Sequence, residues 1–117
     1  MEDNKNKIIQ QIESVSCSIA NEKELQEGLE KILKGFNREH SFGPRDRVDF
    51  FNPETGLAVE VKISGSANRL IMQMMRYMEK PDVTSGLLVT TSRRLAAQMP
   101  NELRGKPVFV ALVSAFM

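Results

Sequence analysis

Residues 57–63, with the sequence LAVEVKI, constrain the fold more than any other segment, because an otherwise apolar strand carries two opposite charges. Successive side chains of a strand point to opposite faces. One face would carry four branched apolar side chains, those of Leu57, Val59, Val61 and Ile63. The other face would carry Glu60 and Lys62 beside Ala58. The segment therefore predicts a strand with one core face and one face that presents a carboxylate next to an ammonium group.

A partner strand is predicted directly before this one, at residues 47–51. The intervening NPETG supplies Asn52, Pro53 and Gly56, which have the chemistry of a hairpin connection. The two strands should therefore pair antiparallel. Asp49 lies near the middle of the first strand, so its carboxylate is expected to approach Glu60 and Lys62 on the second.

The remaining elements follow from periodicity and from turn residues. Helices are predicted at about 5–19, 21–36, 67–79 and 93–99, and further strands at about 38–42, 86–91 and 107–113. This order indicates an α/β or α+β sandwich around a central mixed sheet of about four to five strands flanked by helices. A chain of 117 residues is expected to form one domain, 1–117, with a core at 22–113 and an N-terminal helix in 1–20 that serves assembly.

Composition restricts the location and the kind of metal site. No apolar run approaches the roughly 20 residues that span a bilayer, and the N-terminus has no secretory pattern, so we expect a cytoplasmic protein without a membrane partner. The single cysteine, Cys17, excludes an internal disulfide, and with the single histidine, His40, it argues against a zinc cluster. Any metal would be held mainly by oxygen. The net charge of +1 neither supports nor excludes a nucleic-acid partner.

The predicted grouping of Asp49, Glu60 and Lys62 suits phosphate chemistry. Two neighbouring carboxylates repel and raise each other's pKa unless a cation lies between them, and a hard divalent ion such as Mg²⁺, or Mn²⁺ in its place, fits such an oxygen-rich site. A nearby lysine can help to activate water and can offset the negative charge that builds up on a phosphate. The grouping therefore favours metal-dependent hydrolysis.

The same residues resemble the signature of the PD-(D/E)XK nuclease superfamily. Asp49 in VDF, followed after a turn by Glu60 and Lys62 in VEVK, matches the motif, although Val48 stands where many members have proline. The resemblance implies a restriction-endonuclease-like core and Mg²⁺-dependent hydrolysis of DNA, with Asp49 and Glu60 as metal ligands and Lys62 activating water. A Glu-x-Lys tripeptide also arises by chance, and Glu60 and Lys62 could instead be a surface pair on a solvated sheet face.

The helix that follows the Glu-x-Lys strand adds a second point of resemblance. Gln73 and Tyr77 match the Q-x-x-x-Y motif of the lambda-exonuclease-like and RecB-like branches, whose residues lie beside the site. Arg69 extends this line and Arg76 lies beside it, so the helix could bind phosphate oxygens. Ser64, in the SGS segment after Lys62, is a further candidate for substrate binding. Alternatively, Tyr77 packs at the edge of the core.

A third acidic residue is expected from the helix that precedes the sheet. Glu22 lies on the core line of that helix with Leu25 and Leu29, whereas Glu24 and Glu27 point away from it. Glu22 is therefore the best candidate for an additional metal ligand, although in the first turn it could interact only with the helix dipole. Asp46 is interpreted as a turn residue after Pro44, and Glu39 as a solvated edge-strand residue that could approach the site.

These observations predict a small Mg²⁺-dependent nuclease that resembles the compact nucleases of phage and mobile-element genomes. One site per chain would need two copies to cut both strands of a duplex, so a homodimer or a higher homo-oligomer is expected. Two alternatives remain: a catalytically weak nucleic-acid-binding module on the same fold, and an interaction protein that uses its methionine-rich helix. The sequence does not distinguish an endonuclease from an exonuclease, or DNA from RNA.

Overall fold

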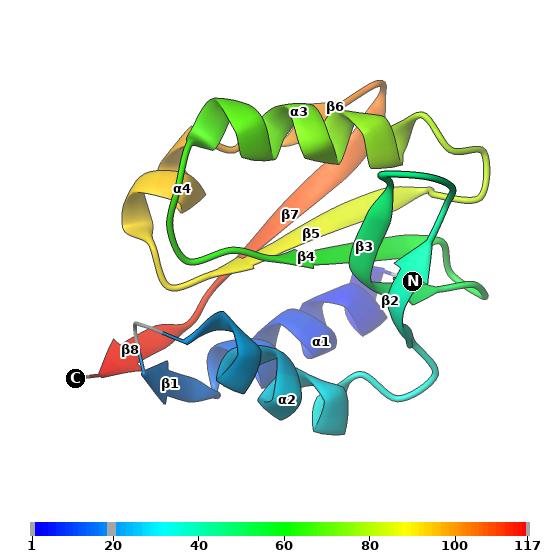
Figure 1. Cartoon of the computed structure of the whole chain (residues 1–117). Helices are drawn as coiled ribbons and strands as arrows, with labels where there is room; N and C mark the ends of the chain where they lie inside the picture. Colours follow the sequence, from blue (N-terminus) through cyan, green and yellow to red (C-terminus); the bar gives the residue numbers. More distant parts are fainter. Residues whose placement is uncertain (1, 19–20, 117) are drawn as a thin grey trace.

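A mixed sheet of six strands forms the centre of the protein in the computed structural model, which describes residues 2–18 and 21–116 (Figure 1). In spatial order the strands are β2 (Asn37–Ser41), β3 (Arg47–Asn52), β4 (Leu57–Val61), β5 (Ser85–Thr90), β7 (Lys106–Leu112) and β6 (Glu102–Leu103). β2, β3 and β4 pair antiparallel, whereas β4, β5 and β7 are parallel. The predicted mixed α+β architecture is confirmed, with a sheet that is wider than the four to five strands expected.

Helices cover both faces of this sheet (Figure 1). α1 (Glu2–Glu13) and α2 (Glu22–Ile32) lie on one face, and α3 (Ala67–Met78) and α4 (Arg93–Gln98) lie on the other. The core line predicted for the second helix is confirmed at Leu25 and Leu29, which are buried. The predicted range 21–36 was too long, because α2 ends at Ile32 and Leu33 is its C-cap. Each face thus has its own hydrophobic cluster, so β4 is buried along its whole length.

The first helix is shorter than predicted, because β1 (Ser16–Ser18) follows it and pairs in parallel with β8 (Ser114–Phe116). The predicted range 5–19 was therefore wrong beyond Glu13, and its last residue lies outside the described part of the chain. The pairing joins Ser16 to Ser114, at opposite ends of the chain. Such a strand is stabilised by a distant partner and not by local periodicity, which explains why the local pattern did not reveal it.

Polar caps and one close helix–strand approach fix the elements around the site. Asn21 caps α2, as predicted, and Ser66 caps α3, each accepting a hydrogen bond from a backbone N–H of the first turn. Gly86 in β5 lets α3 approach closely, because a Cβ there would displace the terminal methyl group of Met78. α3 can therefore lie directly over β4 and β5. No helix in residues 2–18 or 21–116 is long and apolar enough to cross a membrane.

Candidate active site

Asp49 and Glu60 face each other where β3 and β4 separate, and we call these two residues the acidic pair. Backbone pairing between the strands runs from Asn52↔Leu57 to Phe50↔Val59 and stops there. Beyond that point, side chains bind the backbone of the opposite strand. Asp49 Oδ2 accepts a hydrogen bond from the Val61 N–H at 2.7 Å. Glu60 Oε1 lies 3.4 Å from the Asp49 backbone nitrogen, which donates to it. Each carboxylate thus binds the backbone of the opposite strand, and the predicted convergence is observed.

Burial raises the pKa of both members of the acidic pair, and neighbouring negative charges add to the shift. Burial is the largest cause for Glu60, followed by the charge of Asp49, and together they raise its pKa to about 8. Burial also raises the pKa of Asp49 to about 6, although the hydrogen bond from Val61 opposes this shift. Glu60 is only 6% exposed, so the alternative of a solvated surface pair is wrong for its carboxylate. The pair is a buried site of high proton affinity that a cation would stabilise.

Tyr77 and Gln73 of α3 form a hydrogen-bonded chain that ends on Glu60. Gln73 Nε2 donates to the Tyr77 hydroxyl oxygen at 2.8 Å. That hydroxyl in turn lies 2.7 Å from the Arg47 carbonyl oxygen and 3.3 Å from Glu60 Oε1, either of which can accept its proton. Tyr77 is 0% exposed, and burial raises the pKa of its hydroxyl. The buried hydroxyl of Tyr77 therefore reaches Glu60 and not the surface, so its predicted contact with substrate has no support from this geometry.

Two more charged residues of the predicted set, Glu22 and Lys62, lie next to the acidic pair. Glu22, the first residue of α2, accepts a hydrogen bond from the Ile63 N–H at 3.1 Å, directly after Lys62. The negative charge of Glu22 contributes to raising the pKa of Asp49, whereas the positive charge of Lys62 lowers the pKa of both Asp49 and Glu60. Residues from α2, β3 and β4 are thus brought together, and Glu22 is not merely at a helix terminus in solvent.

Glu39 is a further acidic neighbour to which the sequence pattern gave little weight. It lies in β2 between the pairs Arg38↔Phe50 and His40↔Val48, and so opposite Asp49. Its charge contributes to raising the pKa of Asp49. Its backbone has a φ of 51°, a left-handed conformation that is uncommon for a non-glycine residue. No local sequence signal predicts that conformation.

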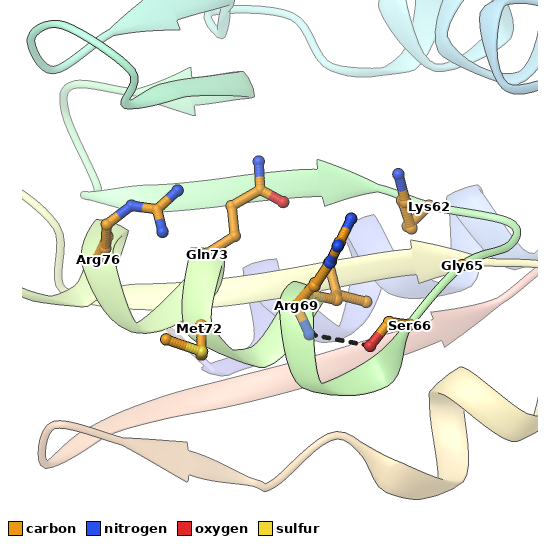
Figure 2. Close-up of a pocket in the computed structure, with 8 residues that line it drawn as sticks. Lys62, Gly65, Ser66, Arg69, Met72, Gln73 and Arg76 are labelled. Atoms are coloured by element: carbon orange, nitrogen blue, oxygen red, sulfur yellow. Dashed lines mark hydrogen bonds between the residues drawn. The ribbon is translucent and has the colours of Figure 1, made fainter.

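An open groove of about 520 Å³ adjoins the acidic pair along α3, and we call it the basic groove. It is lined by Lys62, Gly65, Ser66, Arg69, Leu70, Met72, Gln73 and Arg76. Figure 2 shows that Lys62, Arg69 and Gln73 extend to the same side of α3. Three cationic side chains therefore border one surface next to buried carboxylates. Ser64 is exposed and does not line this groove, so its proposed contact with substrate has no support from the groove.

Asp46, interpreted from the sequence only as a turn residue, binds two cations of α3 and its C-terminal end. Its Oδ1 lies 2.9 Å from Arg76 Nε, and its Oδ2 lies 3.0 Å from Lys80 Nζ. We call these three residues the Asp46 clamp. Hydrogen bonds from both cations hold the pKa of Asp46 below its usual value. The turn residues around Asp46 gave no local signal of this contact, because its partners follow 30 and 34 positions later in the chain.

The acidic pair and its neighbours can hold a hard divalent cation as far as donor chemistry is concerned. Asp49, Glu60 and Glu22 offer only carboxylate oxygens, and the pKa values of Asp49 and Glu60 are raised first by burial and then by neighbouring negative charges, both of which a cation would offset. In the described residues, no three side chains of His, Cys, Asp or Glu are grouped closely enough to enclose an ion. Asp49 and Glu22 each direct an oxygen to a backbone N–H. The magnesium ion stays a prediction.

Comparison of the chain with protein-family models, with curated proteins and with solved structures gives no match. The function is therefore inferred from the chemistry of the acidic pair and the basic groove, and not from relatives.

Proposed function

We propose that the protein is a metal-dependent nuclease that hydrolyses phosphodiester bonds of DNA. The observation that carries this proposal is the buried acidic pair, with Lys62 beside it, at the edge of a groove bordered by Lys62, Arg69 and Arg76. Buried carboxylates of raised pKa and a surface bordered by three cationic side chains are the two halves of a site for a metal ion and a phosphate. Asp49, Glu60 and Lys62 also retain the spacing of the PD-(D/E)XK signature, which supports a restriction-endonuclease-like core.

Each residue of the site has a distinct role in this proposal. Asp49 and Glu60 would hold Mg²⁺, with Glu22 as a further ligand, and the bound ion would supply Lewis acidity at the scissile phosphate. Lys62 would orient the attacking water and offset the charge that develops on the phosphate oxygens. Tyr77 would hold Glu60 in place through its hydroxyl, while Gln73 fixes the orientation of that hydroxyl.

The basic groove would bind the sugar-phosphate backbone. Arg69 is exposed and is the only arginine of α3 whose side chain forms no ion pair in the described part of the chain. Its guanidinium can therefore donate to phosphate oxygens without first breaking a contact. Because phosphate contacts carry no sequence information, this surface favours binding without strong sequence preference.

The experiment that tests the proposal is incubation of the protein with supercoiled, linear, single-stranded and branched DNA in Mg²⁺, in Mn²⁺ and in EDTA. We expect cleavage in Mg²⁺ and Mn²⁺ and none in EDTA. The supercoiled substrate separates internal from terminal cleavage, because an exonuclease needs an end. An RNA of matched sequence tests the choice of nucleic acid. Binding without cleavage under all conditions would favour the alternative of a binding module, and neither binding nor cleavage would leave an interaction protein.

A further inference from the structure

The guanidinium of Arg76 contacts Asp46 through one nitrogen and leaves its other two nitrogens available to the basic groove. Only the Nε atom of Arg76 donates to Asp46, at 2.9 Å, while Arg76 also lines the basic groove. Figure 2 shows the two terminal nitrogens of Arg76 on the side that faces Gln73. Within residues 2–18 and 21–116, no hydrogen bond or ion pair occupies these terminal nitrogens, which together carry four N–H donors. The guanidinium of Arg76 is therefore fixed at Nε, while its two terminal nitrogens can donate to a ligand.

Asp46 is itself held firmly enough to position a partner. Its backbone C=O accepts from the Phe42 N–H at 2.8 Å, and its backbone N–H donates to the Gly43 carbonyl at 3.2 Å. Its side chain is 15% exposed, compared with 47% for Arg76. Phe42, in the same turn, packs its ring against those of Phe51 and Tyr77. The turn that carries Asp46 is thus attached to the same tyrosine that contacts Glu60.

We propose that Asp46 is a positioning residue for nucleic-acid binding, which fixes Arg76 so that its terminal nitrogens meet a backbone phosphate in the basic groove. This inference rests on the proposed function and adds to it a residue outside the predicted site. A long exposed arginine loses side-chain entropy when it binds a phosphate, and an arginine that is already ordered loses less. Only arginine can serve both partners at once, because the ammonium group of a lysine is a single point charge without a separate Nε.

Asp46 could instead mask the charge of Arg76, and a measurement of the coupling between these two residues distinguishes the two roles. If Asp46 merely neutralised Arg76, its removal would free the arginine, and Arg76 would then contribute more to binding. If Asp46 positions Arg76, its removal lowers the contribution of Arg76. The sign of the coupling between the two residues therefore distinguishes positioning from masking.

The test is a double-mutant cycle on the affinity for a short fluorescent DNA duplex in EDTA, with wild type, Asp46→Ala, Arg76→Ala and the double variant. We expect Arg76→Ala to weaken binding about fivefold in the wild-type background, as for the loss of one charge-assisted contact, and by less than about twofold when Asp46 is absent. When Asp46 is present, Arg76→Lys should bind the duplex more weakly than wild type. In the Asp46→Ala background, Arg76→Lys should bind as well as Arg76 does. Arg69→Ala, which has no bond to Asp46, should weaken binding equally in both backgrounds.

Glu79→Ala is the matched control, because it also removes one negative charge near the C-terminal end of α3, but Glu79 pairs with Arg104 at 2.8 Å and not with Arg76. Its cycle with Arg76→Ala should be additive. Asp46→Asn keeps an acceptor for Nε, and it should retain the coupling if Asp46→Ala proves poorly folded by circular dichroism. An additive Asp46–Arg76 cycle, or one in which Arg76 matters more without Asp46, overturns this inference while leaving the nuclease proposal intact. Absence of DNA binding by the wild type overturns both.

Discussion

Asp46 and Asp49 lie three positions apart in the chain, yet the protein treats their carboxylates in opposite ways. Asp46 sits at the surface between Arg76 and Lys80, and its pKa is lowered by their hydrogen bonds. Asp49 lies beneath α3 beside Glu60, and burial raises its pKa to about 6. The charged form of the same chemical group is thus favoured at one position, and its protonated form is favoured at the other.

The opposite pKa shifts of Asp46 and Asp49 reflect whether each carboxylate has a cationic partner. Two cations already neutralise Asp46, so its role is to hold those cations in place. Asp49 and Glu60 accept hydrogen bonds from backbone N–H groups, but no ion pair reaches either of them among the residues described. A buried carboxylate pair without a counterion stores unfavourable free energy that metal binding would release. The acidic pair is therefore suited to take up a cation, and the Asp46 clamp is not.

The largest expected effect is on the rate of DNA cleavage, and it distinguishes Lys62, near Asp49, from Lys80, which binds Asp46. Lys62→Ala should lower the rate of DNA cleavage at least about 100-fold, since it removes the cation expected to stabilise charge at the reacting phosphate. Lys80→Ala, next to Asp46, should change kcat little and act mainly on KM. The measurement is initial cleavage rate against DNA concentration in Mg²⁺. A folded Lys62→Ala protein that cleaves at the wild-type rate would remove Lys62 from the mechanism.

The second prediction concerns stability of the metal-free protein as a function of pH. The pKa of Glu60 rises from 4.5 to about 8 on folding, so the folded state binds the proton more tightly than the unfolded state. The free energy of unfolding should therefore fall as the pH rises through that interval, and Asp49 adds to this fall between 3.8 and about 6. Glu60→Gln should flatten the fall and stabilise the protein at pH 8 by on the order of 2 kcal/mol.

Asp46 supplies the internal control, because its lowered pKa gives the opposite sign. The stability that it contributes is present above its unfolded pKa of 3.8 and is lost as the pH falls through its folded value. Asp46→Asn should thus weaken the protein at neutral pH, whereas Glu60→Gln strengthens it. Urea titrations in EDTA at several pH values measure both. A pH profile of Glu60→Gln that matches wild type would show that Glu60 does not carry this penalty.

Sequence patterns predicted the parts of the molecule that depend on local periodicity. The hairpin of β3 and β4 formed as expected because the NPETG turn and the alternation of 57–61 agree with each other. That hairpin alone places Asp49 opposite Glu60. The strand alternation also placed Lys62 correctly, since it lines the groove on the α3 side together with Gln73.

Features that depend on distant partners were not predictable in the same way. The β1–β8 pair joins the two ends of the chain, the left-handed backbone of Glu39 has no local signature, and Asp46 finds its cations on a helix 30 positions later. The burial of Tyr77 was only an alternative in the sequence, because its helical spacing is the same whether it faces substrate or core. Tertiary packing decided each of these cases.

The smallest expected effect tests the third carboxylate, Glu22, which stands between the two extremes of Asp46 and Asp49. It is partly buried and binds the Ile63 N–H, yet its charge acts on Asp49 from a helix on the opposite face of the sheet. If Glu22 completes the metal site, Glu22→Gln should lower the affinity for Mg²⁺ and Mn²⁺ about tenfold, since a charged ligand becomes a neutral one. The amide oxygen can still accept from Ile63, so the metal-free variant should fold as well as wild type or better. Glu24→Gln and Glu27→Gln, both exposed on the same helix, should bind metal like wild type. Isothermal titration of metal into each variant decides the matter: equal affinities for all three would assign the third ligand to water or to Glu39.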